Sequence, residues 1–375
     1  MDEWTRAEAA HIAGRFERDL AALVAVSSPS GDAVAFEECA AIAIALAPEE
    51  TSVERQPCSS PDHAPDLLLR LEGTGRARLL LVGHLDTVHA HGTHRPLERV
   101  GDRWVGSGSV DMKGGVVVAL AVLRALAERR ADFAEVALLL VADEEWRTAP
   151  FAHVDRFAGW NACLCFEAGQ LADGEEAVVV KRKAAGTIRV TATGRAAHSG
   201  SAPEKGANAL LALSAAATAV AAQHDPAGPD RLTAVPTVIR SGDAFNVVPA
   251  SGELLCDLRG DSLAAIDAVA SAVPTEVSGA RLHTEQLRRW PPMDSREATA
   301  GLLARAAEAA GRSIVAAGRG GASDASHFAP VIALTVDGLG PRGGAAHNPD
   351  EHVRVDSVEP RAQIALAMAM AALGA

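Results

Sequence analysis

Several features that define common protein classes are scarce or missing in this chain of 375 residues. It contains no tyrosine, only 3% aromatic residues and only five cysteines. The cysteines are odd in number and widely spread, which argues against a disulfide framework. No apolar run reaches the length of a membrane span, and the first residues, MDEWTRAEAA, lack the basic and apolar regions of a signal peptide. We therefore expect a cytoplasmic protein.

Positive charge is also scarce. The formal net charge is −13, and no long basic run is present. This balance argues against nucleic acid or an anionic membrane as a partner. Hydrophobic residues make up 48% of the chain, far above a disordered composition, and the length suffices for two domains that each bury a core.

The pattern of apolar runs predicts an α/β fold, because short apolar runs alternate with helix-like stretches as in a sheet covered by helices on both faces. The expected strands are 77–83, 136–142, 161–169 and 331–336, and the expected helices are 7–26, 35–46, 114–130, 296–310 and 357–373. We expect a mixed, mostly parallel sheet.

The middle of the chain has a different pattern. Residues 186–194 alternate apolar and polar side chains, as a half-exposed strand does. Two helices are expected at 208–222 and 262–272, with antiparallel strands within 233–260. We therefore predict one discontinuous α/β domain, residues 1–183 and 292–375, interrupted by an inserted α+β domain, residues 184–291.

Histidines and carboxylates follow the expected strands closely. The carboxyl ends of strands in an open α/β sheet border one crevice, so these side chains are expected to converge. Two histidines and several carboxylates are ligands that zinc accepts, and a metal pair would supply the positive charge that adjacent acids need. The residues concerned are His84, Asp86, Asp111, Asp143, Glu144, Glu145, Glu167 and His347.

Each of these residues has an ordinary explanation when taken alone. His84 could be a hydrogen-bonded histidine at a strand end, and Asp111 could cap the helix that follows it. The three acids 143–145 could form a solvated turn. Their coincidence at strand ends favours the metal site. In an extended segment Asp86 shares a face with His84, so it could orient the imidazole.

Other motifs carry less weight. Cys163 and Cys165 form a CxC that could ligate metal, but small buried side chains within ACLCF explain them better. The stretch 106–111, GSGSVD, begins like a dinucleotide loop, yet Asp111 replaces the third glycine and would repel pyrophosphate. The stretch 321–325, GASDA, lacks the final glycine of a nucleophile elbow and no strand directly precedes it.

Six stretches together resemble the metallopeptidase 20 family, the co-catalytic zinc exopeptidases that include glutamate carboxypeptidases and aminoacylases. They occur in the family's order and extend over nearly the whole chain. The stretches are GHLDTV (83–88), GSGSVDMKGG (106–115), DEE (143–145), FEAG (166–169), GRAAHSGSAPEKGANAL (194–210) and GGAAHNPDE (343–351).

The resemblance implies a site with two zinc ions per subunit, for which Co²⁺ or Mn²⁺ can substitute. Asp111 would bridge the two ions. His84 and Glu167 would complete one position, and Glu145 and His347 the other.

The resemblance also implies roles in the reaction. Glu144 would be the general base, and Asp86 would orient His84. In the inserted domain, His198 would reach the active site of a partner subunit and stabilise the oxyanion. Asn246 and Arg259 would hold the carboxylate end of the substrate. Outside this resemblance, His198 is a loop histidine and Arg259 a surface arginine at a strand end.

The expected function is therefore hydrolysis of an amide bond by a homodimer, with release of a C-terminal amino acid from a peptide or an N-acyl amino acid. The nearest alternative is an N-acyl-amino-acid deacylase or a pathway-specific amidohydrolase. A deaminase is a further alternative, and a non-catalytic metal-binding scaffold is another. A scaffold would have no use for Glu144 as a base that binds no metal.

Two departures from the family pattern affect the expected substrate. Trp146, Arg147 and Thr148 stand where small residues are usual, and we expect the indole and the cation to narrow or re-charge the substrate pocket. A glutamate-selective relative would place a lysine about eight residues after Glu167, where this chain has Glu175. Glutamate specificity is therefore not expected.

Overall fold

The computed structural model describes residues 2–374, which form two compact units. The first unit comprises the described residues up to Lys181, Met293–Arg319 and the described residues from Ser323 onward. The second unit comprises Arg182–Pro292 and Gly320–Ala322. The expected insert, 184–291, falls inside the second unit, whereas the contribution of 320–322 was not expected.

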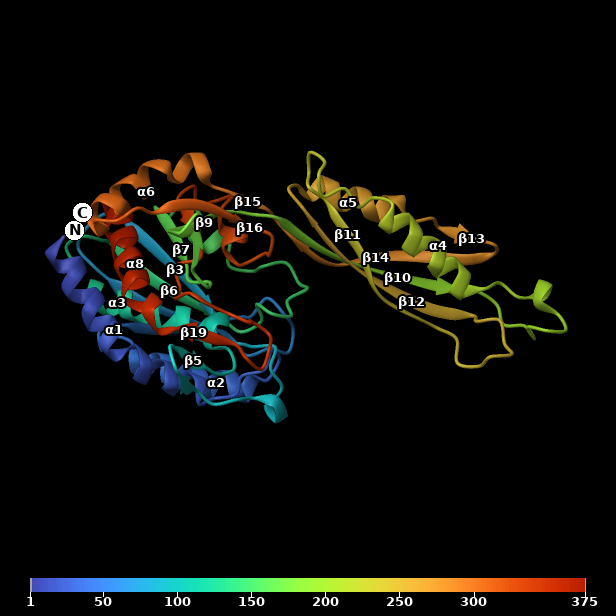
Figure 1. Ribbon diagram of the computed structural model, residues 1–375, viewed down its shortest axis with the longest axis horizontal. Helices are drawn as coiled ribbons and strands as arrows, with labels where there is room; N and C mark the ends of the chain where they lie inside the picture. Colours follow the sequence, from blue (N-terminus) through green and yellow to red (C-terminus); the bar gives the residue numbers. More distant parts are fainter. Residues whose placement is uncertain (1, 375) are drawn as a thin grey trace. The chain divides into compact units, whose positions relative to one another are not determined.

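The first unit is built on a mixed six-stranded sheet (Figure 1). Neighbouring strands β6, β3, β7 and β17 run parallel, whereas β1 and β2 pair antiparallel at one side. This arrangement confirms the predicted α/β class. The order across the sheet is β1 (Ser52–Gln56), β2 (Asp66–Glu72), β6 (Glu135–Val141), β3 (Arg78–His84), β7 (Ala162–Cys165) and β17 (Thr335–Val336).

Both faces of this sheet are buried. Along β3, Leu79 and Leu81 belong to a core shared with helices on one face, whereas Leu80 and Val82 belong to a second core on the other face. Successive side chains of a strand point to opposite faces. An uninterrupted apolar run is therefore what a central strand of this sheet requires. The buried Cys163 and Cys165 lie in the second core, as expected for small apolar fillers.

The helices of the first unit match the expected positions within a few residues, except for the short helix α7, which was not expected. Two of them begin at a residue whose side chain accepts a hydrogen bond from a free backbone N–H of the first turn: Asp2 for α1 and Asp32 for α2. The C-cap of α6 is Gly311, in the left-handed conformation at φ 62°. The helices are α1 (Glu3–Val24), α2 (Ala33–Leu46), α3 (Gly114–Ala127), α6 (Arg296–Ala310), α7 (Ala325–Phe328) and α8 (Val358–Leu373).

Two smaller sheets complete the first unit, and the sequence did not predict them. Except for β9 and β16, their strands have only two or three residues, so local alternation gives little signal. One sheet contains β15 (Met293–Asp294), β9 (Glu175–Arg182), β16 (Val315–Arg319) and β8 (Gln170–Ala172). The other contains β18 (Gly343–Gly344), β19 (His352–Arg354), β5 (Arg103–Val105) and β4 (Glu98–Val100).

The second unit is an antiparallel sheet with two helices packed on it (Figure 1). The apolar side chains of β10 at 188, 190 and 192 join the helices in one core, as the alternation predicted. The strand order is β11 (Thr233–Ser241), β12 (Ser251–Gly260), β10 (Ala184–Thr193), β14 (Ala280–Trp290) and β13 (Glu276–Val277), and the helices are α4 (Ala209–Ala221) and α5 (Leu263–Ala272). Among residues 2–374, no helix combines the length and apolar character needed to cross a membrane.

Helix α3 lies unusually close to the end of β7. A Cβ atom built on Gly115 would lie 1.8 Å from the carbonyl oxygen of Phe166, the residue before Glu167. Only glycine fits there without movement of one backbone or the other. This contact fixes the distance between the start of α3 and the strand end that carries Glu167.

We predict that Gly115→Ala lowers the midpoint of denaturant-induced unfolding, with a loss of stability of about 1–3 kcal/mol, because the methyl group overpacks a backbone contact. Gly14→Ala is the matched control: Gly14 lies inside α1, and a Cβ there meets nothing within 4 Å. That change should raise stability by about 0.5–1 kcal/mol. Equal effects of the two changes would contradict the assignment of the close contact.

Candidate metal centre

The parallel strands of the first unit end at one edge of the sheet, and the expected ligands lie at or just beyond these ends. His84 is the last residue of β3. Glu145 follows β6, and Glu167 follows β7. Because β3 pairs in parallel with both β6 and β7, their carboxyl ends lie side by side. The sheet therefore brings together three side chains that are far apart in the sequence.

The side chains form two groups that share Asp111. One contains His84, Asp111 and Glu167, and the other contains Asp111, Glu145 and His347; within each group, the potential ligand atoms lie within 4.8 Å of one another. His84 Nε2 lies 3.3 Å from Asp111 Oδ1, and His347 Nε2 lies 3.2 Å from Asp111 Oδ2. The two oxygens of one carboxylate therefore face different groups, as a bridging ligand requires.

Asp111 does not cap α3. Its backbone is non-helical, at φ −125° and ψ 89°, within the π-helical turn Ser109–Lys113, and the N-cap of α3 is Lys113. The Asp111–Met112 peptide bond is cis. His347 has a left-handed backbone at φ 64°, which is uncommon for residues other than glycine and is found mostly where the surrounding structure imposes it. Both residues are held by irregular backbone.

The electrostatics of the two groups favour positive charge. The carboxylates of Asp111 and Glu145 raise the pKa of His347 to about 10. Burial opposes the charged form of His84, but Asp111 and Asp86 outweigh it and hold the pKa of His84 well above its ordinary value. Burial, together with the charge of Asp111, raises the pKa of Glu167. The crowded carboxylates thus create a strong demand for cations.

Asp86 connects the first group to the segment after β6. One of its carboxylate oxygens lies 3.3 Å from His84 Nδ1, on the side of the ring away from Asp111. The same carboxylate accepts hydrogen bonds of 3.2 Å from the backbone N–H groups of Glu144 and Glu145. Asp86 therefore holds the imidazole and the glutamate pair together. The side chain of Glu144 is buried and belongs to neither ligand group.

The residues present suit a pair of divalent metal ions. Each group offers one imidazole nitrogen and two carboxylates, which is a donor set for zinc and related borderline cations. In the part of the chain that the structure describes, His84 Nε2 and Glu145 Oε1 are buried and have no hydrogen-bond partner. Buried polar atoms of proteins are normally paired, and coordination to a metal would satisfy both.

The three adjacent acids, residues 143–145, have different surroundings, and Asp143 is paired with Arg147. The expectation that Arg147 re-charges the substrate pocket is wrong. Its side chain is fully buried, donates a hydrogen bond of 2.9 Å to Asp143 and forms an ion pair with Asp324. Its guanidinium also lies 4.4 Å from the ring centroid of Phe151. Trp146 is 61% exposed.

Nothing in the local sequence pattern indicates this buried network. Asp324 lies in GASDA, which was set aside as an incomplete nucleophile elbow. The spacing of residues within a short segment cannot predict an ion pair between positions 147 and 324, which are far apart in the sequence. The burial of Arg147 becomes evident only in the tertiary structure, which places Asp143 and Asp324 beside it. Removing one partner from such a buried pair leaves an uncompensated charge, so the network fixes the segment that carries Glu144 and Glu145.

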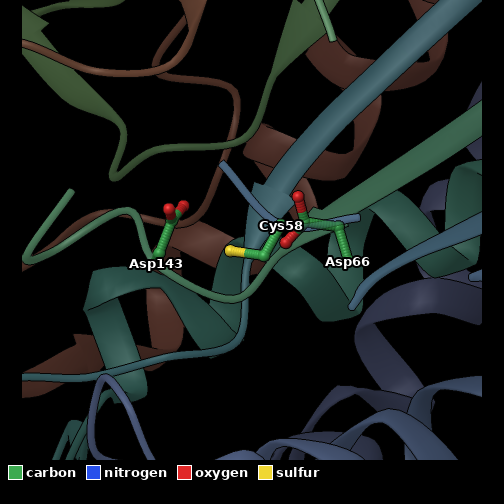
Figure 2. A group of neighbouring side chains, drawn as sticks. All are labelled: Cys58, Asp66 and Asp143. Carbon is green, nitrogen blue, oxygen red and sulfur yellow. The ribbon is translucent and has the colours of Figure 1, made fainter. Parts of the chain in front are cut away.

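A third group of potential ligands, Cys58, Asp66 and Asp143, lies beside this network (Figure 2). Its carboxylates already have partners within the protein. Asp66 accepts hydrogen bonds from the backbone N–H of Ala142 and from His153. Asp143 accepts them from the N–H of Ser60 and from Arg147. Burial also raises the pKa of the Cys58 thiol, which disfavours the metal-binding thiolate. The hydrogen bonds of Asp66 and Asp143 therefore hold the segment after β6 in place.

The remaining predicted residues lie in the second unit. His198 and Asn246 are exposed and adjacent: the N–H of Ser199 donates to the carbonyl of Asn246, and His198 Nδ1 accepts from Gly200 and Ser201. Arg259 lies near the C-terminal end of β12, whereas Asn246 precedes the start of this strand. Two guanidinium nitrogens of Arg259 donate hydrogen bonds to the carboxylate of Asp257. Within this unit, His198 and Asn246 form one cluster, and Arg259 is separate from it.

Known proteins with similar sequences identify the family of this chain. The model of peptidase family M20/M25/M40 matches residues 80–371. Carboxypeptidase G2 of Pseudomonas sp. is 28% identical over 324 residues, which cover 80% of this chain and 75% of that protein. A succinyl-diaminopimelate desuccinylase of Methylorubrum extorquens is 32% identical over 234 residues, covering 56% of this chain and 59% of that protein.

Solved structures show the same fold. Aminopeptidase PepT of Bacillus cereus superimposes with a TM-score of 0.75 at 20% identity, covering 97% of this chain and 99% of that chain. An M20 family metallo-carboxypeptidase of Sulfolobus solfataricus gives a TM-score of 0.74 at 13% identity, covering 96% and 99%. With the family match over most of its length, the chain belongs to peptidase family M20/M25/M40 and is a hydrolase of that family.

Proposed function

We propose that this protein is a di-zinc amidohydrolase that removes a C-terminal amino acid from a peptide or an N-acyl amino acid. The observation that carries the proposal is the division of the ligands into two groups around Asp111, one carboxylate oxygen facing each. His84 and Glu167 hold one ion, and Glu145 and His347 hold the other. Bound in this way, the ions would polarise the amide carbonyl and acidify the attacking water.

Glu144 is the proposed general base. It takes the proton of the attacking water and passes it to the leaving amine, which a carboxylate can do because it carries a proton transiently. Its placement depends on Asp86, which binds the backbone N–H groups of Glu144 and Glu145. Arg147 supports the same segment through Asp143. The base is thus held on both sides while remaining outside the ligand set.

The second unit supplies the proposed substrate contacts. The residues of β12 that precede Arg259, 251–258, separate it from the His198–Asn246 cluster, so at about 3.4 Å per residue the two lie roughly 27 Å apart. A small substrate cannot span this distance within one unit. We therefore propose a homodimer in which His198 and Asn246 act at the metal centre of the partner subunit.

The exposed edge of the second unit suits this homodimer. Strand β11 is an edge strand that pairs with β12 on one side among the described residues, and it exposes Val235 and Ile239. Helix α4 exposes Leu211 nearby in the same unit. Long edge strands with apolar side chains tend to pair with other chains. A second copy would cover these groups by the same contacts in both subunits.

The leading alternative is an N-acyl-amino-acid deacylase, favoured by the similarity to the desuccinylase. Both activities cleave an amide and leave a free amino acid, so they differ in the acyl side of the substrate.

A cytoplasmic location also stays a prediction. It is supported by the five cysteines, all of which are free thiols in the structure.

We predict that Glu144→Gln retains two zinc ions per chain but lowers kcat by about 10²- to 10⁴-fold, because it removes proton transfer and no ligand. Glu145→Gln should lose zinc, since it removes a ligand of the second group. Zinc is measured by elemental analysis of the samples used for kinetics. The same zinc loss in both variants would mean that the two roles are wrongly assigned.

His198 can be tested by complementation. We expect His198→Ala to reduce kcat by about 10²- to 10³-fold, the range for loss of one oxyanion donor. Mixing His198→Ala subunits with Glu144→Gln subunits should restore activity, because each mixed dimer contains one centre with an intact base and an intact histidine. Each variant alone serves as the control. If mixing restores nothing although subunits exchange, the shared site is wrong.

Substrate class is tested with dipeptides and N-acyl amino acids, each with a free or an amidated C-terminal carboxylate. We expect release of the C-terminal amino acid, and amidation should lower kcat/KM by about 10- to 100-fold because it removes a charge-assisted hydrogen bond to Arg259. Cleavage of N-acyl amino acids without cleavage of dipeptides would favour the deacylase, whereas cleavage of dipeptides would favour the peptidase activity. Release of ammonia without an amino acid would instead identify a deaminase.

A further inference from the structure

The loop that carries Asp111 presents several backbone N–H groups to one point. Gly108 has a left-handed backbone at φ 71°, and a Cβ there would lie 2.6 Å from the side chain of Thr87. After Gly108 the chain enters the π-helical turn, in which Asp111 and Met112 are non-helical. The N–H groups of Gly108, Val110 and Asp111 are therefore available to an acceptor outside the turn. Successive N–H groups arranged in this way favour an anion.

The carboxylate of Glu351 occupies this position. Its Oε1 accepts hydrogen bonds of 2.9 Å from Val110 N and 3.0 Å from Asp111 N. Its Oε2 accepts one of 2.9 Å from Gly108 N and lies 2.8 Å from His89 Nε2. Glu351 is only 1% exposed. Each carboxylate oxygen thus has two partners, which satisfies the acceptor capacity of the group.

Glu351 also belongs to the loop that carries the second histidine. It follows His347 by four residues, and its own N–H bonds the carbonyl of Asn348. Its carbonyl accepts a further hydrogen bond from Gly106 N, at 3.0 Å. One buried side chain therefore ties the segment of Asp111 to the segment of His347, which are more than two hundred residues apart in the sequence. Asp111 is the residue that both ligand groups share.

We propose that Glu351 is a positioning residue: it fixes the backbone of Asp111 relative to His347 and thereby sets the metal affinity of the centre. The inference rests on the proposed function, because it takes both ligand groups as metal sites. Glu351 is not itself among the ligands, since the hydrogen-bond partners of its carboxylate are backbone N–H groups and His89. Groups that orient a metal ligand change metal affinity or activity by about 10- to 100-fold when removed.

The substitution Glu351→Gln isolates this effect, because it preserves the shape of the side chain. An amide keeps one oxygen that accepts two hydrogen bonds, but its NH₂ group faces donors at the other position. Either the pair Val110–Asp111 or the N–H of Gly108 then loses its acceptor, whereas His89 Nε2 can accept from the amide in its other tautomer. Unpaired buried donors favour a shift of the loop, and the shift displaces the carboxylate of Asp111 from both groups.

The experiment compares zinc affinity by competition with a chelator in the wild type and in Glu351→Gln, together with the visible spectrum of the Co²⁺-loaded proteins. We expect Glu351→Gln to bind zinc about 10- to 100-fold more weakly, with an altered Co²⁺ spectrum and a metal-free form that still unfolds cooperatively. Zinc affinity and a Co²⁺ spectrum equal to those of the wild type would overturn the inference, whatever the activity. If Glu351→Gln does not fold, Glu351→Asp, which keeps the charge on a shorter side chain, decides by the same readouts.

Asp19→Asn is the matched control. Asp19, on α1, is also 1% exposed, and its carboxylate accepts hydrogen bonds from Arg18 and Arg124, neither of which is a proposed ligand. This change should lower stability and leave zinc affinity and the Co²⁺ spectrum unchanged. A fall in affinity equal to that of Glu351→Gln would show general destabilisation and would overturn the inference. Measurements on the wild type distinguish failure of the proposed function from failure of this inference. If the wild type does not bind two zinc ions, the proposed function is contradicted. If the wild type binds them and Glu351→Gln has the same zinc affinity and Co²⁺ spectrum, only the role of Glu351 is contradicted.

Discussion

Negative charge concentrated at one edge of a buried sheet is the constraint on which the rest of the first unit depends. Carboxylates taken out of water repel one another and must be paired. The chain meets this demand in two ways. Asp143 is neutralised by the buried guanidinium of Arg147. Asp111 and Glu145 instead face His347 across 3.2 Å, in a space whose electrostatics and donor atoms suit a divalent cation. Adjacent acids therefore serve different purposes.

The architecture explains why the chemistry is located where it is. The central strands are covered on both faces, so that Leu80 and Leu81 enter different cores and no polar group fits between them. Functional side chains can then stand only at strand ends, where the chain leaves the sheet. The irregular loops at this edge need fixed positions, which the fold supplies through close backbone contact at Gly115 and through the buried carboxylate of Glu351.

Much of the fold and most of the ligand set were predictable from local signals. The long apolar runs predicted β3 and β6, and the helix-like stretches predicted the helices other than α7 within a few residues. Short strands were missed or placed too long. The run 161–169 forms a strand only over Ala162–Cys165, because the chain leaves the sheet before Glu167. The run 331–336 forms a strand only over Thr335–Val336, because the N–H groups of Val331 and Ile332 still bond the carbonyl of Phe328 at the end of α7. Whether such a run extends depends on partners distant in sequence.

The sequence by itself determined which residues could bind metal, because parallel strands must end at a common edge and only a few side chains carry suitable donor atoms. Only the tertiary structure decided which way each of them turns. It directed Arg147 inward to Asp324 and away from any pocket, placed both oxygens of Asp111 between two histidines, and separated Arg259 from His198 along β12. The physical reason is that burial and pairing of charge are set by contacts between distant segments, which the spacing within any one segment does not encode.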